Sequence, residues 1–220
     1  MNLQEFPLYV KAGFDLADTL RAPTTGEWKV VKINPVNPEP VLIMKLDLSG
    51  TPKRTFLSLK REKEMEFTLV IPFTMPAVAM DALDKDNTLI PGINLASLGD
   101  NWEIYLNGSL VKAEMDLDGE GRIISHRNYR SINFPVHKNL LNLGENILAI
   151  KIVGDPTFSD VGLFYATPYE IDSYTVILRD NNKTLTLGLI GIYLFMGIYH
   201  LFMFFARKKD AHNLYYGLFS

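Results

Sequence analysis

The side chains best suited to hold a ligand gather in one polar stretch of the chain. It contains Arg122, His126, Arg127, Asn128, Tyr129 and Arg130. Guanidinium, imidazole and amide groups donate hydrogen bonds in fixed directions, so this combination is suited to a carboxylate or a hydroxylated ligand. We therefore expect a loop-rich rim that binds a small molecule, a saccharide being one candidate. A solvated loop and a contact with a neighbouring domain are the competing interpretations.

Two aromatic residues in the segment WEIYL offer a second binding chemistry, because aromatic rings stack on the apolar faces of sugars. Side chains alternate along a strand, so Trp102, Ile104 and Leu106 share one face and Tyr105 lies on the other. A large ring in the apolar row is typical of a core. We expect Trp102 in the core and keep Tyr105 as a surface residue that contributes to ligand binding.

The sequence lacks the motifs of a catalytic or metal centre. It has no G-x-S-x-G elbow, H-E-x-x-H pair, Walker loop or G-x-G-x-x-G turn. The acidic run at 116–120 lacks the later ligands of an EF-hand, which favours a solvated turn. The four histidines, His126, His137, His200 and His212, lack metal-ligand spacing. We expect no metal, no cofactor and no enzymatic activity in these residues.

Charge and composition exclude further classes of protein. The net charge is −3 and no basic stripe appears before the last fifteen residues, so nucleic acid is not an expected partner. With 47% hydrophobic and 21% charged residues, the chain is expected to fold. The absence of cysteine excludes disulfides and thiolate sites, which is compatible with a periplasmic location.

Short apolar runs of period two, separated by turn signals, dominate the region that must position these side chains. The clearest predicted strands are Val41 to Leu48, Glu64 to Phe73, Trp102 to Leu106, Ser131 to Pro135 and Ile147 to Val153. The dipeptide Asn107-Gly108 predicts a type I′ hairpin turn, because both residues tolerate a positive φ. The pattern predicts a mainly β fold, an antiparallel β-sandwich of roughly eight strands.

The remaining segments divide the chain around this sandwich. The proline-containing residues 1–40 are expected to form a leading arm, 41–171 the sandwich and 172–183 a tether. Residues 184–206 carry no formal charge over 23 positions, which is enough to cross a bilayer as a helix. We predict a transmembrane α-helix there, with a buried core helix as the alternative.

The flanks of this helix suggest its orientation. Arg207, Lys208 and Lys209 follow it, whereas Arg179 and Lys183 precede it with Asp180 between them. The positive-inside rule then places residues 207–220 in the cytoplasm and the sandwich outside. The apolar run after Asp210 predicts a turn and the start of a second, truncated membrane helix. Because an exported domain needs an export signal and residues 1–20 lack one, we expect the natural start to lie upstream.

The order WEIYLNGSLV, then FPVHKNLLNLGENILAIKIVG, then LGLIGIYLFMGIYHLFMFFARKKDAHNLYYGLFS resembles the 7TM-DISM receptors, bacterial seven-transmembrane receptors with diverse intracellular signalling modules. The resemblance covers about residues 95–220, and the segments KAGFDL and GEWKV are more loosely similar. It implies a jelly-roll, galactose-binding-like outer domain and a cytoplasmic output such as a cyclase, kinase or phosphatase, which these residues do not contain.

The expected function follows from the resemblance. The chain is expected in the bacterial inner membrane with its N-terminal domain in the periplasm, where it binds a small ligand and transmits to an output module outside the chain. Its expected partners are that ligand, membrane lipid and other copies, because Gly188, Gly191 and Gly197 offer small surfaces for helix packing. The alternatives are a structural or protein-interaction sandwich and an accessory domain of a membrane-bound carbohydrate enzyme.

Overall fold

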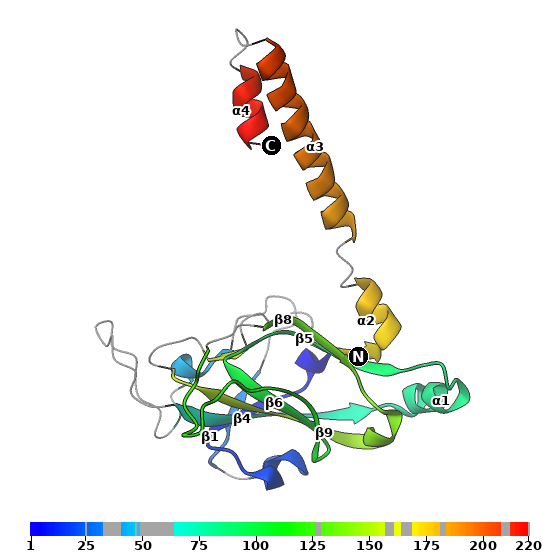
Figure 1. Cartoon of the computed structure of the whole chain (residues 1–220). Coiled ribbons are helices and arrows are strands. Elements are labelled where there is room, and N and C mark those ends of the chain that lie inside the picture. Colours follow the sequence, from blue (N-terminus) through cyan, green and yellow to red (C-terminus); the bar gives the residue numbers. More distant parts are fainter. Residues whose placement is uncertain are drawn as a thin grey trace. The chain divides into compact units, whose positions relative to one another are not determined.

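The computed structural model describes residues 1–24, 26–32, 41–46, 48, 64–125, 129–156, 161–163, 169–180, 184–207 and 212–219. The chain divides into two compact units, Met1–Leu178 and Arg179–Ser220. The first unit contains the β-sheets and the second contains the long apolar helix (Figure 1).

The first unit contains a six-stranded antiparallel sheet with the order β2-β1-β4-β9-β6-β7. Its strands are β1 (Leu8–Ala12), β2 (Lys29–Val31), β4 (Met65–Met75), β6 (Asn101–Leu106), β7 (Ser109–Glu114) and β9 (Gly144–Gly154). The long central strands β4 and β9 pair over their whole length, from Met65 opposite Gly154 to Met75 opposite Gly144. This pair supplies much of the apolar face of the sheet.

A five-stranded antiparallel sheet forms the second layer. It comprises β3 (Val41–Leu42), β5 (Pro91–Gly99), β8 (Tyr129–Pro135), β10 (Gly162–Leu163) and β11 (Glu170–Ser173). The strand β5 is central, because β8, β10 and β11 all pair with it. Alternate residues of the two layers, such as Phe67 of β4 and Ile93 of β5, are fully buried in one continuous core. The predicted antiparallel β-sandwich is confirmed.

The connections carry short helices that the period-two pattern did not predict. α1 (Ala77–Lys85) follows β4 at one end of the sandwich, and α2 (Tyr174–Asp180) follows β11 directly (Figure 1). Single 3-10 turns occur at η1 (Leu3–Glu5), η2 (Leu16–Thr19), η3 (Ile43–Lys45) and η4 (Lys138–Leu140). The nine-residue α1 buries only Leu83, so its pattern is too weak to recognise from the sequence.

The predicted Asn107-Gly108 hairpin is present, with φ of 48° at Asn107 and 82° at Gly108. The Asn107 side chain donates to Asn146 Oδ1 at 2.8 Å and accepts from the Ile147 amide at 2.8 Å. Asn146 in turn accepts from the Asn142 amide at 2.7 Å and donates to Gly144 O at 2.9 Å. These paired asparagines fasten the β6–β7 turn to the start of β9, so the segments YLNG and LGEN meet in space.

Three expected boundaries need correction. The predicted strand Val41 to Leu48 ends at Leu42, because a 3-10 turn follows at Ile43–Lys45. Within the expected leading arm 1–40, β1 and β2 instead belong to the six-stranded sheet, since β1 pairs with β4 and β2 pairs with β1. The expected tether 172–183 begins as the end of β11 and continues as α2, where Ile177 is only 1% exposed. The boundaries of these segments are set by packing within the sandwich rather than by proline content.

The second unit confirms the predicted apolar helix with the expected bounds, as α3 (Thr184–Ala206). Within the part of the chain that the structure describes, it is the one helix long and apolar enough to cross a membrane, with a mean hydropathy of 2.0 over Leu187–Ala206. α4 (His212–Phe219) packs against α3, and the rings of His200 and Tyr216 lie 5.4 Å apart.

Candidate functional site

The structure describes only part of the set of residues expected to bind a ligand. His126 and Arg127 lie outside the described residues, as does Asn128. Tyr129 and Arg130 begin β8, where Leu98 and Ser97 of β5 are their partners, but their side chains lie outside what the structure describes. Only Tyr105 and Arg122 can be placed in full, and the rim remains a prediction.

Arg122 lies in an exposed acidic turn that satisfies its own charges. Its Nε is 2.8 Å from Asp118 Oδ2, and one terminal nitrogen is 3.2 Å from Glu120 Oε2. Asp118 also accepts from the Arg122 and Glu120 amides at 2.9 Å, and these hydrogen bonds hold the pKa of its carboxyl below the usual value. An anionic ligand would have to compete with two carboxylates for this guanidinium.

Trp102 is fully buried in the main core, whereas Tyr105 lies in a second buried cluster with Val70, Ile147 and Ala149. The expectation of an open surface at Tyr105 needs correction, because its side chain is only 8% exposed. Phe14 stacks on the ring with centroids 5.5 Å apart, and the hydroxyl donates to Glu103 Oε2 at 2.7 Å. Burial first and the Glu103 carboxylate second raise the pKa of Tyr105 to about 12.

The segment Gly13–Leu20 covers this outer face of the six-stranded sheet, and it is the reason that Tyr105 is shielded. Gly13 O accepts from Thr68 Oγ1 at 2.6 Å, and Asp18 is 2.7 Å from Lys11 Nζ. Lys151 Nζ lies 5.0 Å from the centre of the Phe14 ring and 2.8 Å from Glu66 Oε1. The result is a closed aromatic and charged cluster rather than an open binding platform.

An open cleft lies beside this cluster. It has a volume of about 610 Å³ and is lined by Lys11, Ala12, Gly26, Glu27, Trp28, Lys29 and Leu48. Lys11 Nζ is 4.9 Å from the centre of the half-buried Trp28 ring, within cation–π range. A large ring flanked by ammonium and carboxylate groups can bind a hydroxylated ring by stacking and hydrogen bonds. We name these seven residues the Trp28 cleft.

Sequence reasoning missed the Trp28 cleft. The signal was the run Glu27-Trp28-Lys29, which sets one large ring between opposite charges. The run falls within the expected leading arm 1–40, and an extended arm gives no reason to expect a cleft. β2 places Lys29 opposite Val10 of β1, and this pairing brings the run beside Lys11.

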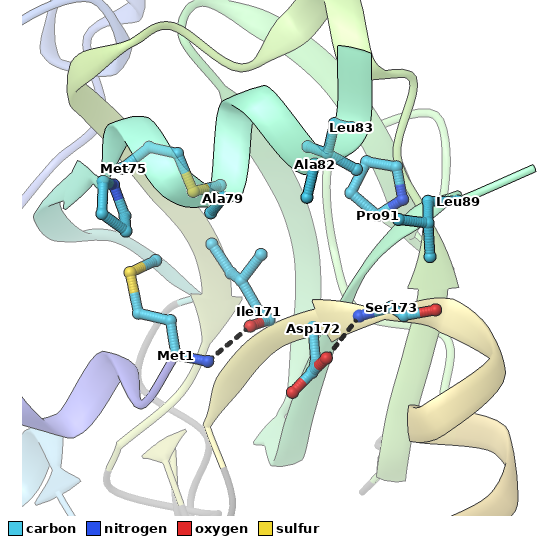
Figure 2. Close-up of a pocket in the computed structure, with 11 residues that line it drawn as sticks. Met1, Met75, Ala79, Ala82, Leu83, Leu89, Pro91, Ile171, Asp172 and Ser173 are labelled. Atoms are coloured by element: carbon cyan, nitrogen blue, oxygen red, sulfur yellow. Dashed lines mark hydrogen bonds between the residues drawn. The ribbon is translucent and has the colours of Figure 1, made fainter. Parts of the chain in front are cut away.

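A second cavity, of about 280 Å³, lies between α1 and the strand β11 (Figure 2). Its walls are almost entirely apolar and are formed by Met1, Met75, Pro76, Ala79, Ala82, Leu83, Leu89, Pro91, Ile171, Asp172 and Ser173. We name it the α1 cavity. Among the described residues, no group of three or more His, Cys, Asp or Glu side chains is arranged to hold a metal ion.

No protein-family model matches the chain, and the comparison with curated proteins finds no match either. Solved structures give partial similarity. A β-glycosidase from Bacteroides vulgatus is 14% identical with a TM-score of 0.48, covering 76% of this chain and 19% of that one. β-Glucuronidase 2 from Bacteroides uniformis, a calcium-binding mutant, is 16% identical with a TM-score of 0.47, covering 74% and 17%.

A glycosyl hydrolase family 2 member from Bacteroides cellulosilyticus is 12% identical with a TM-score of 0.48, covering 72% of this chain and 19% of that one. The chain therefore spans less than a fifth of the length of each of these three structures.

Proposed function

We propose that the chain is the extracytoplasmic sensor region and first membrane span of a bacterial signalling receptor of the 7TM-DISM kind. Its sandwich lies in the periplasm and binds a small ligand, with a saccharide as the leading candidate. The signal passes to a cytoplasmic output module outside these 220 residues. A sensor of this type works only if the ligand has different affinities for two states of the receptor.

The direct continuation of β11 into α2 is the observation that carries the proposal. β11 pairs with the central strand β5 through four residues, from Glu170 opposite Asn94 to Ser173 opposite Pro91. α2 starts at the next residue, Tyr174, and the apolar α3 starts at Thr184. A change in the second sheet therefore has a short covalent route to the membrane helix.

The first part of this route, α2, is packed closely on the second sheet. Gly92 of β5 leaves room for the helix, since a Cβ at that position would lie 2.9 Å from Tyr174 Cδ2 and 3.1 Å from Ile177 Cδ1. Ile177 is 1% exposed and so packs fully against the domain. Packed elements shift together rather than deform continuously, so a movement of β5 would be passed to α2.

The Trp28 cleft is the ligand site that we favour for this function. Its volume lies within the range of small-molecule sites, and its lining combines the Trp28 ring with the charged side chains of Lys11, Glu27 and Lys29. Lys11 is held by Asp18 on one side and by the Trp28 ring on the other, so its ammonium is positioned before a ligand arrives. Pre-organised donors lower the entropic cost of binding. A hydroxylated ring with an acidic group matches these chemistries.

The test is thermal denaturation of the sandwich piece Met1–Asp180 with neutral sugars, acidic sugars and organic acids. A ligand at 100 times its dissociation constant stabilises a fold by about 2.7 kcal/mol, which raises the Tm of a domain of this size by roughly 5–10 °C. We expect Trp28→Ala to abolish the shift and Val30→Ala, an exposed neighbour on β2, to keep it.

Two other outcomes separate the alternatives. A shift that survives Trp28→Ala but is lost when Arg127 and Arg130 become alanine would move the ligand site to the rim expected from the sequence. A flat response across the whole ligand set would contradict the sensor proposal and favour a structural or protein-interaction sandwich.

A further inference from the structure

The α1 cavity differs in chemistry from the Trp28 cleft. Among the described residues that line it, none is aromatic, and Asp172 and Ser173 supply the polar side chains. Figure 2 shows Ile171 pointing toward α1 and the Asp172 carboxylate pointing away, where it accepts from the Ser173 amide at 2.6 Å. The space beneath the helix is therefore bounded mostly by methyl, methylene and thioether groups, and the Met1 ammonium at its edge donates to Ile171 O at 2.7 Å (Figure 2).

Small side chains on α1 keep this space open. Ala79 and Ala82 face the cavity from the helix, beside the buried Leu83, while Ile171 closes the opposite side (Figure 2). A longer aliphatic side chain at either alanine would occupy the volume. The space is partly open to solvent, since Ala82 is exposed, so water contacts its apolar lining. A molecule that fills it would remove that apolar surface from water.

The size and lining set the class of occupant. Enclosed apolar cavities of about 150 Å³ bind benzene or xenon. The α1 cavity has a volume of about 280 Å³ and is partly open to solvent, so it can admit molecules of that size and larger. The charged groups among its lining residues already have backbone partners: the Met1 ammonium donates to Ile171 O at 2.7 Å, and the Asp172 carboxylate accepts from the Ser173 amide at 2.6 Å. The apolar walls therefore favour an uncharged occupant, because burying an unpaired charge is costly. The flexible thioether of Met75 can adapt to different shapes.

We propose that the α1 cavity is a second ligand site, which takes a small, uncharged, apolar molecule such as an alkylbenzene or a medium-chain alcohol. The observation behind it is the juxtaposition of Ala79 and Ala82 with Ile171 around an apolar space. This site is independent of the Trp28 cleft, because the two share no residue. One wall is β11, so occupancy bears on the strand that continues into α2.

The experiment uses toluene as the probe and the whole 220-residue chain in lipid nanodiscs. Methionine labelled with 13C at its methyl group reports the site directly, since Met75 lines the cavity, and Met75→Leu assigns its resonance. We expect a saturable shift of the Met75 methyl signal. Ala79→Leu should weaken toluene binding at least tenfold, because the new side chain fills the cavity.

Val78→Leu is the matched control, because Val78 lies on the same helix with 81% exposure and does not line the cavity. It should bind toluene like the parent chain, and so should Trp28→Ala. If Ala79→Leu does not fold, Ala82→Leu makes the same test. A Met75 signal that does not shift, or that shifts equally in Ala79→Leu, would overturn the proposal, since the second result indicates partition into lipid only.

Discussion

At the scale of single residues, buried polar side chains explain why two short motifs matter. The Asn107 side chain, in the β6–β7 turn, bonds to the backbone of Leu140 and Ile147. The Asn146 side chain, in β9, bonds to the backbone of Asn142 and Gly144 and to the Asn107 side chain. Asn146 is 1% exposed, so water cannot replace its partners. Buried donors and acceptors that lose their partners are expensive, whereas exposed ones are not. The buried hydrogen bonds of this network therefore stabilise the sandwich.

We expect Asn146→Ala to lower the free energy of unfolding by about 2–4 kcal/mol, because several buried hydrogen-bonding groups lose their partner at once. The exposed Asn142 takes part only through its backbone, so Asn142→Ala is the matched control and should change stability by less than about 0.5 kcal/mol. Urea denaturation of Met1–Asp180 measures both. Equal effects would show that the network is not a stabilising unit.

The hydroxyl of Tyr105 gives the outer face a response to alkaline pH. Its folded pKa is raised to about 12 from the ordinary value of 10.0, first by burial and then by Glu103. The folded state thus holds this proton more tightly than the unfolded chain, so the resulting stabilisation is complete below pH 10 and lost as pH rises through 12. We expect the stability of the parent chain relative to Tyr105→Phe to fall across this window.

The absorbance of tyrosinate, measured as the pH is raised through 10 and 12, checks this expectation. The difference in titration between the parent and Tyr105→Phe should show one group ionising near pH 12. A difference curve centred near pH 10 would mean that Gly13–Leu20 does not shield the ring.

At the scale of elements, α2 is the part that links the sandwich to the apolar helix. It is short, at seven residues, and a helix of that length depends on tertiary packing rather than on propensity. The glycine at position 92 and the burial of Ile177 provide that packing. Loss of the packing between α2 and β5 should therefore release α2 before it unfolds the sheets.

Gly92→Ala tests the packing of α2 against β5. The new Cβ would lie 3.1 Å from Tyr174 Cα, a backbone atom that cannot turn aside as a side-chain tip can. We expect a loss of about 1–3 kcal/mol and faster amide hydrogen exchange in Tyr174–Asp180. Gly119→Ala is the control, because a Cβ there meets nothing within 4 Å. Unchanged hydrogen exchange in α2 would show that the packing at Gly92 does not stabilise the helix.

At the scale of the whole molecule, the proposed receptor requires that α3 span a membrane. The large apolar side chains of this helix are mostly exposed in the second unit, as lipid contact demands. Only 6% of its most apolar window is buried inside the protein. A core helix of a water-soluble fold would show the opposite.

We expect the whole chain to remain in the membrane fraction after alkaline carbonate extraction, while Met1–Asp180 is released into the soluble fraction. With an export signal added, protease applied to spheroplasts should digest the sandwich if it lies in the periplasm. Release of the whole chain by carbonate would contradict the membrane span. Protection of the sandwich in intact spheroplasts, with digestion only after lysis, would reverse the proposed orientation.

The sequence by itself was sufficient for features that depend on local periodicity. Alternation predicted the strands around Phe67 and Ile150 and the inward face of Trp102, and a charge-free run of apolar residues predicted α3. The Asn107-Gly108 turn was predictable because backbone φ is a property of the residue itself.

Only the tertiary structure decided what covers each outward face and where cavities remain. Tyr105 is shielded because Phe14, ninety-one positions earlier, stacks on it, and the Trp28 cleft exists because β2 and β1 pair. The α1 cavity depends on Ala79 and Ile171, which are adjacent only in space. These features arise from contacts between residues far apart in sequence, and periodicity carries no information about which distant segments will meet.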